Sequence, residues 1–262
     1  MLILALESSA KPASVAVCGD GALLGQYFQN NGLTHSRTLL TMAESLLINL
    51  DMTVAEIDLV AVACGPGSFT GVRIGVSAAK GLAWGLDKPV CGVSTLEAMA
   101  YQFPEPGVLL CPVMDARRGQ VYNALFEWRG DTLARLCEDR AICLEELESG
   151  LREHAGRAAP RIVLIGDGAE MTYGYLAGKG VDCRAAPQLL RYQTALGVAL
   201  AARGKQPVSP AELEPSYLRP SQAERERAAA SAEASTAASV AATATASAAA
   251  SVATSAAASA NH

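Results

Sequence analysis

Hydrophobic residues in the first half of the chain gather in short continuous runs that polar turns separate. The runs have the length of strands, and the Gly19-Asp20-Gly21 turn between the second and third is typical of a β-hairpin. The pattern therefore predicts a three-stranded meander followed by two further buried strands. The five runs lie at residues 2–6, 14–18, 22–28, 59–64 and 89–93.

Two helical patterns lie between these predicted strands. Thr34 can cap a helix over residues 34–50, whose apolar positions form a wider band than one core-facing stripe needs. Either thorough burial in the chain's own fold or contact with another subunit explains that band. A second helix is expected over residues 70–86, and small residues four positions apart on it would let another backbone approach closely. These residues are Gly71, Gly75 and Ala79.

The second half of the chain opens with the same pattern as the first. Apolar residues 108–114 and 121–128 flank a polar turn and predict a second hairpin, so in both halves an apolar strand ends at a carboxylate, Glu7 or Asp115. This weak internal repeat predicts an α/β fold of two lobes. The remaining predicted elements are a buried strand, a glycine loop that opens a helix, and a helix, at residues 162–165, 166–169 and 188–203.

We therefore divide the chain into three parts. Residues 1–100 form the first lobe and carry the helices suited to dimerisation. Residues 101–220 form the second lobe, with the helix near 188–203 placed to pack back on the first. Residues 221–262 are rich in Ala and Ser and lack aromatic side chains and apolar bulk, so we expect a disordered or weakly helical low-complexity tail.

Composition narrows the classes of protein to which the chain can belong. Its 262 residues carry a formal net charge of −5, which makes it a poor candidate for holding nucleic acid through phosphates on its own. No apolar stretch is long enough to span a bilayer, and the N-terminus has no basic lead typical of a signal peptide. Seven scattered cysteines without a CxxC pair are typical of reduced thiols in a cytoplasmic protein.

Candidate chemistry is concentrated at the strand ends. Glu7 and Asp115 would face one cleft if the strand ends of both lobes meet there, and two carboxylates suit a hydrated metal–phosphate group. Ordinary turn acids, with Asp115 paired to a neighbouring arginine, are the alternative. The loops 65–71 and 166–169 offer backbone N–H groups to an anion, but close backbone packing explains their glycines equally well. The candidate cleft residues are Glu7, Ser8, Gly65, Gly67, Ser68, Asp115, Gly166 and Gly168.

Reactive side chains are otherwise few. The three histidines are His35, His154 and His262; no two have the spacing of zinc ligands on a helix, and no GxSxG nucleophile motif occurs. His35 lies beside the expected helix cap, a position more typical of a capping or interface residue than of a general base. We therefore predict no catalytic residue and no metal-binding residue in the chain.

Four segments resemble the TsaB (YeaZ) family. The run GPGSFTGVRIGVSAAKGLA at residues 65–83 is the most specific, and three other segments agree with it: LALESS with SVAV, GVSTLEAMA with DARRGQVY, and EPSYLR at 214–219. The resemblance covers residues 1–220. It implies the actin-like ATPase/sugar-kinase fold, in which each of two lobes is built on a βββαβα unit.

The resemblance also implies a function in making threonylcarbamoyladenosine beside the anticodon of tRNAs that read codons beginning with A. In that family TsaB is the non-catalytic partner of a paralogue, TsaD, which carries a metal-binding HxxxH motif, and the P-loop ATPase TsaE joins them. It implies pairing with TsaD through the two first-lobe helices. Whether the subunit alone forms a homodimer through the same helices stays open, and the acidity of the chain favours tRNA contact only through the complex. We assign no cofactor to the chain firmly; for ATP or ADP with magnesium, this chain's cleft, the complex interface and no site at all stay open as alternatives. We assign the partner interface to Leu39, Leu40, Ala43, Leu47, Gly71, Gly75 and Ala79.

Two other functions stay open beside this one. A nucleotide-binding kinase or ATPase of the same fold would hold a magnesium nucleotide with Glu7 and Asp115, although the family's first turn begins with Asp where this chain has the longer Glu7. A peptidase would need a nucleophile–base pair or a zinc site, and the spacing of the residues offers neither.

Overall fold

The first sheet is built around β1 (Leu2–Glu7), in a computed structural model that describes residues 1–155 and 161–219. The strand order is β3-β2-β1-β4-β5, with β2 antiparallel to both of its neighbours and with β4 and β5 parallel to β1. Every predicted strand of the first half is confirmed. Their bounds are β2 Ala13–Gly19, β3 Ala22–Gln29, β4 Leu59–Gly65 and β5 Val90–Ser94.

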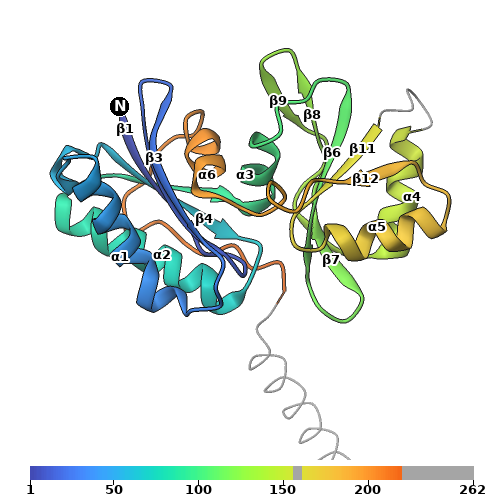
Figure 1. Ribbon diagram of the computed structural model, residues 1–262, viewed down its shortest axis with the longest axis horizontal. Coiled ribbons are helices and arrows are strands. Elements are labelled where there is room, and N and C mark those ends of the chain that lie inside the picture. Colours follow the sequence, from blue (N-terminus) through green and yellow to red (C-terminus); the bar gives the residue numbers. More distant parts are fainter. Residues whose placement is uncertain (156–160, 220–262) are drawn as a thin grey trace, which may run out of the picture. The chain divides into compact units, whose positions relative to one another are not determined.

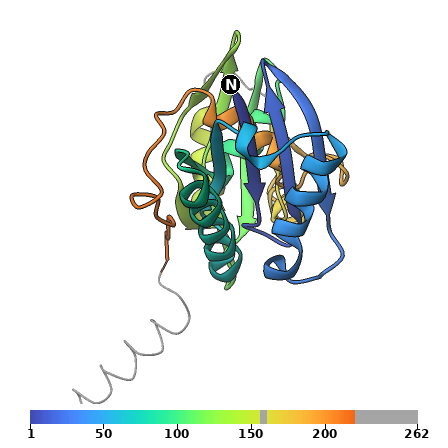
Figure 2. The same ribbon diagram turned by 90° about the vertical axis from the view of Figure 1, so that its left-hand side faces the viewer.

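Helices cover both faces of this sheet (Figures 1 and 2). On one face lie α1 (His35–Asn49) and α2 (Phe69–Leu86), which bury one side each among Leu4, Val15 and Val62. On the other face lies α6 (Ala195–Ala202), which comes from the far end of the described chain. A short 3-10 helix, η1 (Val54–Glu56), precedes β4.

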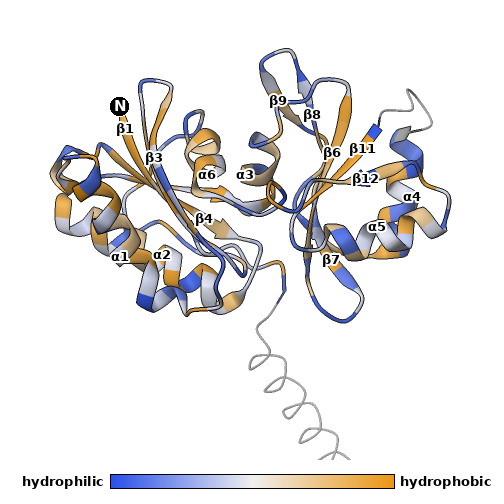
Figure 3. Ribbon diagram, in the orientation of Figure 1, coloured by the Kyte–Doolittle hydropathy of each residue, from blue (hydrophilic) through white to orange (hydrophobic). Residues whose placement is uncertain are grey.

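The second sheet is built around β6 (Val108–Asp115) and has the path β10-β7-β6-β11-β12, while β8 pairs with β6 and β9. Its central strands are strongly hydrophobic, as Figure 3 shows for β6 and β11. The other helices of this half are α4 (Leu144–Ala155) and α5 (Ala169–Gly178). The strand bounds are β7 Gln120–Asn123, β8 Phe126–Arg129, β9 Thr132–Arg135, β10 Arg140–Cys143, β11 Arg161–Ile165 and β12 Cys183–Ala185.

Two predicted elements differ from the structure. The single strand expected over 121–128 is two strands, β7 and β8, because Pro112 of β6 has no N–H to continue the ladder beyond the Val113–Asn123 pair. The Asn123 side chain instead donates to the Pro112 carbonyl at 3.0 Å. The helix expected over 188–203 is only α6, because residues 187–191 form a turn in which Leu190 donates to the Pro187 carbonyl.

A short helix, α3 (Thr95–Tyr101), joins the two halves. Its Ala98 belongs to the core beneath α6, and its Leu96 and Met99 belong to the core of the second sheet. We call the first sheet with α1, α2 and α6 the first lobe, and the second sheet with α4 and α5 the second lobe. Residues Met1–Leu218 form one compact unit. The tail predicted at 221–262 lies outside the described residues.

Candidate functional site

The turn after β1 holds its acidic residue inside the protein. Glu7 is fully buried, and its Oε1 accepts the backbone N–H of Ser9 at 2.6 Å. Burial raises the pKa of Glu7 to about 7, against the lowering effect of the hydrogen bonds from Ser9. His35 closes the turn, since its Nε2 lies 2.7 Å from the Ala10 carbonyl oxygen. The expectation that Glu7 and Ser8 line an open cleft is therefore wrong.

The glycine-rich loop 65–71 is filled by the protein's own backbone. Gly65 has a φ of +122°, and a side chain there would collide with the Ser216 carbonyl. Gly67 lies in the same way against the Ser9 carbonyl, whose oxygen accepts the Ser68 N–H at 2.6 Å. Close backbone packing, rather than an anion site, is thus what this loop provides. The first-lobe cleft residues do not fit a bound phosphate.

The corresponding turn of the second lobe is more open. Asp115 at the end of β6 accepts the N–H of Arg117 at 2.7 Å and lies 3.8 Å from its guanidinium, as an ordinary turn acid would. Asp167 lies close by, and its pKa is raised by burial and by the charge of Asp115. Gly166 and Gly168 let this loop approach the β6 backbone closely. The structure thus places Asp115 beside Asp167, while Glu7 is buried in the turn after β1.

The described residues contain neither a cluster of metal ligands nor a membrane-spanning helix. Within residues 1–155 and 161–219, no three His, Cys, Asp or Glu side chains come together as metal ligands would. No helix in the same ranges has the length and apolarity needed to cross a membrane.

The predicted partner residues on α1 and α2 mostly face inward. Leu39, Ala43, Leu47 and Ala79 are buried in the first lobe's own core, because these positions form the stripe that packs on the sheet. Gly71 and Gly75 are buried against the Ser8 turn. Their assignment to a partner surface is wrong for these six residues. Only Leu40 of the predicted set is exposed, at 48%.

A different set of residues lies on the solvent side of the same two helices. On α1 the exposed apolar residues are Leu40 and Ile48, and on α2 Trp84 is 68% exposed. Gly81 and Gly85 have open space where a side chain would be. The α2 residues chosen from the sequence lie on the inward face of the helix, because small residues recur on both faces and the pattern does not distinguish them. We call the following set the outer α1–α2 face: Leu40, Ile48, Ser77, Gly81, Trp84 and Gly85.

The segment from Val208 to Tyr217, which lies within the residues that we assigned to the second lobe, packs on the first lobe instead. Val208 pairs with Val90, and the Ser216 N–H donates to the Cys64 carbonyl at 2.6 Å. Tyr217 stacks on Phe69 with ring centroids 5.0 Å apart. The segment therefore holds the glycine loop and the start of α2 in place.

Comparison with known proteins places the chain in a family. A family model described as TsaD, tRNA N6-adenosine threonylcarbamoyltransferase, matches residues 31–261. The Haemophilus influenzae protein named tRNA threonylcarbamoyladenosine biosynthesis protein TsaB is 30% identical over 237 residues, which are 84% of this chain and 94% of that protein. The chain belongs to the TsaB family. The TsaB protein of Bacillus subtilis is 37% identical over 153 residues, covering 58% of this chain and 67% of that protein.

Solved structures agree with this assignment. YeaZ from Pseudomonas aeruginosa has a TM-score of 0.68 and 26% identity, covering 83% of this TsaB-family chain and 99% of its own. The two-lobed α/β arrangement that the internal repeat predicted is confirmed. The actin-like ATPase/sugar-kinase fold is the name that the family resemblance implies for it. The family is thus established on the fold as well as on the sequence.

Proposed function

We propose that this chain is the assembly subunit for threonylcarbamoyladenosine formation in tRNA, and that it acts by pairing with a TsaD-like catalytic paralogue. Relatives of the chain are named for this biosynthesis, and the matching family model is named for the transferase. The paralogue would bind the outer α1–α2 face. The subunit's differential contacts would hold the paralogue in its competent conformation.

The outer α1–α2 face is the observation that carries this proposal. Leu40, Ile48 and Trp84 expose apolar side chains there, while Gly81 and Gly85 leave the surface of α2 flat. An apolar surface with small residues lets a partner helix approach closely, and an aromatic residue such as Trp84 supplies a large contact area. The same face would form the homodimer when the subunit is alone.

A non-catalytic role agrees with the composition of the chain. Its only histidines are His35, His154 and His262, so it contains no HxxxH motif of the kind that the resemblance assigns to the paralogue. The net charge of −5 also favours contact with tRNA only through the complex. A TsaE-like P-loop ATPase as third component, a cytoplasmic location, and ATP or ADP with magnesium at the complex interface remain predictions.

Reconstitution tests the proposal. This chain is mixed with the HxxxH paralogue, the P-loop ATPase, threonylcarbamoyl-adenylate and unmodified tRNA; each protein is omitted in turn, and digested tRNA is analysed by mass spectrometry. We expect modification to require this chain and the chain alone to make none. Modification that proceeds equally well without the chain would overturn the proposal.

Two matched variants locate the pairing surface in the same assay. Gly81→Arg places a charged side chain on the outer α1–α2 face, while Gly174→Arg does the same on α5, and neither position has an atom within 4 Å of the added Cβ. We expect Gly81→Arg to lose modification and Gly174→Arg to retain it. The reverse result would place the partner on the second lobe.

A further inference from the structure

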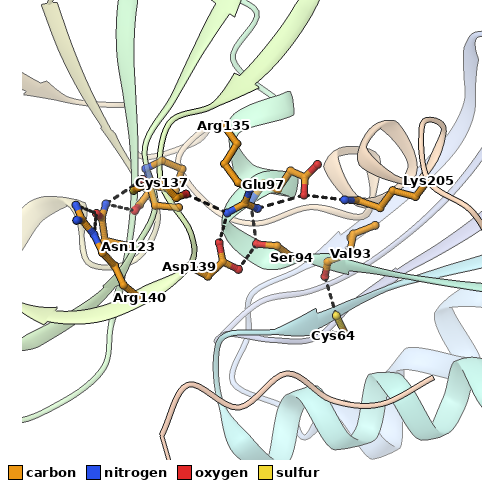
Figure 4. Close-up of polar contacts among 12 residues, drawn as sticks. Cys64, Val93, Ser94, Glu97, Asn123, Arg135, Cys137, Asp139, Arg140 and Lys205 are labelled. Atoms are coloured by element: carbon orange, nitrogen blue, oxygen red, sulfur yellow. Dashed lines mark hydrogen bonds and ion pairs between the residues drawn. The ribbon is translucent and has the colours of Figure 1, made fainter. Parts of the chain in front are cut away.

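Polar and charged side chains connect the two lobes around α3 (Figure 4). Arg135 of β9 donates to Asp139 at 2.6 Å and to Glu97 of α3 at 3.2 Å. Glu97 also accepts a hydrogen bond from Lys205, just after α6, at 3.0 Å. We call these residues, together with Ser94, the Arg135 network. Its Ser94 pairs with Gly65 at the start of the glycine loop 65–71, and its other members belong to α3, to β9 and to the segments that follow β9 and α6.

The network links one lobe to the other by two routes of hydrogen bonds and ion pairs, each of which we call a tie. The first runs from Asp139 in the second lobe to the Ser94 hydroxyl at the end of β5, at 2.5 Å. The second runs from Arg135 in the second lobe through Glu97 to Lys205 in the first. Because Arg135 bonds to both carboxylates, the two ties are coupled at one guanidinium.

The charges of the network balance, and water has limited access to them. Two cations, Arg135 and Lys205, face two anions, Glu97 and Asp139, so no member is left unpaired. The side chains of Arg135, Glu97 and Asp139 are 25%, 16% and 15% exposed. The Arg135 guanidinium also lies 4.7 Å from the centroid of the Phe126 ring. Partly buried, charge-assisted bonds of this kind are screened less by water than surface ion pairs.

The packing around α3 adds to the effect of these bonds. Residues of α3 belong to the cores of both lobes, and Gly197 of α6 lies so close to the Ala98 carbonyl that a side chain there would collide with it. Thr194 donates to the Gln102 side chain at 2.8 Å on the same junction. A rotation of one lobe against the other would break several of these contacts together.

We propose that the Arg135 network fixes the two lobes at one relative orientation, so that the protein is a single rigid body and not a pair of hinged lobes. Lobes joined by a short connection usually move against one another unless their interface prevents it. The ties through Ser94 and Glu97 are that restraint. The proposal concerns the chain alone and does not depend on its proposed partner.

Distance measurement between the lobes tests the proposal. Ketone-bearing residues for nitroxide labelling replace the exposed Glu44 of α1 and Glu153 of α4 in the full-length chain, which leaves the seven cysteines untouched. The labelled protein is diluted into an excess of unlabelled protein, so that distances between two subunits do not contribute. Pulsed electron spin resonance should then give one narrow distance for the parent protein, unchanged by magnesium-ATP. In Arg135→Gln we expect a second distance population. Two populations in the parent protein would overturn the proposal.

Two further variants complete the design. Arg152→Gln removes an ion pair to Glu148 that lies wholly within the second lobe, and it should leave the single distance unchanged. Ser94→Ala removes the hydrogen bond to Asp139 and the N-cap hydrogen bond that Ser94 Oγ accepts from the Glu97 N–H, without changing any charge. It decides the question if Arg135→Gln fails to fold by circular dichroism. A folded Ser94→Ala or Arg135→Gln protein with the parent's distance would overturn the proposal.

Discussion

The Ser8 hydroxyl donates a hydrogen bond of 2.9 Å to the Gly71 carbonyl, so the turn after β1 is fastened to the first turn of α2. A side chain at Gly71 would collide with the Ser8 carbonyl itself, which is backbone and cannot rotate away. We expect Gly71→Ala to lower the free energy of unfolding by about 1–3 kcal/mol through overpacking. Urea unfolding followed by circular dichroism measures the change.

Gly81→Ala is the matched control for this prediction. Gly81 lies on the same helix with nothing within 4 Å of an added Cβ, so the substitution only improves helix propensity. It should raise the free energy of unfolding by about 0.5–1 kcal/mol. Equal effects of the two substitutions would contradict the close contact between Ser8 and Gly71.

Glu7 should make the stability of the protein depend on pH. Its pKa is raised from 4.5 to about 7 in the folded state, because burial disfavours the charged form. Between these values the unfolded chain binds fewer protons than the folded one, so stability is highest below the lower pKa and falls as pH rises to about 7. The full effect is on the order of 3 kcal/mol.

Glu7→Gln should remove this pH dependence, because a neutral amide of the same size can still accept the Ser9 N–H. Melting temperatures between pH 4.5 and 8 should converge at the acidic end and separate above it, with the variant more stable. Glu44→Gln, at an exposed position, should follow the parent curve. If the melting temperatures of Glu7→Gln and the parent change with pH in the same way, ionisation of Glu7 does not destabilise the folded protein and the prediction is wrong.

The sequence predicted those features whose cause is local. The first-lobe strand positions, α1, α2 and the internal repeat follow from apolar periodicity and turn residues, and the 65–83 motif identified the family. The short strands β9, β10 and β12 and the division of residues 121–128 into two strands were not predicted. The sequence could not tell which face of α2 packs inward, because both faces carry glycine. Only the tertiary fold shows that Gly75 lies against Ser8 in the turn after β1, whereas Gly81 faces open space. Nor could it find the Arg135 network, since Ser94 and Lys205 meet Arg135 and Asp139 only through the tertiary fold.

Tyr217 should stabilise the segment that covers the glycine loop. Its ring stacks on Phe69, and its hydroxyl accepts a hydrogen bond from Arg73 at 2.7 Å. We expect Tyr217→Ala to cost about 1 kcal/mol and to expose the segment to proteolysis. Tyr173→Ala on α5 is the control, because both tyrosines are 41% exposed. Equal cleavage rates for the two variants would mean that the stacking does not hold the segment.

Leu47 and Ile48 are neighbours on α1, and substitutions at the two positions test folding and pairing separately. Leu47 is 6% exposed and packs in the first lobe's core, whereas Ile48 is 68% exposed on the outer α1–α2 face. Leu47→Asp should therefore cost at least about 3 kcal/mol, since it buries a charge and removes core packing. It should unfold the subunit and so cannot report on pairing.

Ile48→Asp should leave the subunit folded and abolish pairing with the TsaD-like paralogue, because an apolar interface would then bury an unpaired charge. Analytical ultracentrifugation of the mixture measures pairing, and thermal unfolding of each variant alone measures stability. Leu189→Asp is the control, because Leu189 is 95% exposed and lies in the second lobe's turn at residues 187–191. If Ile48→Asp pairs normally while Leu189→Asp does not, the partner binds the second lobe, and the surface proposed on α1 and α2 is wrong.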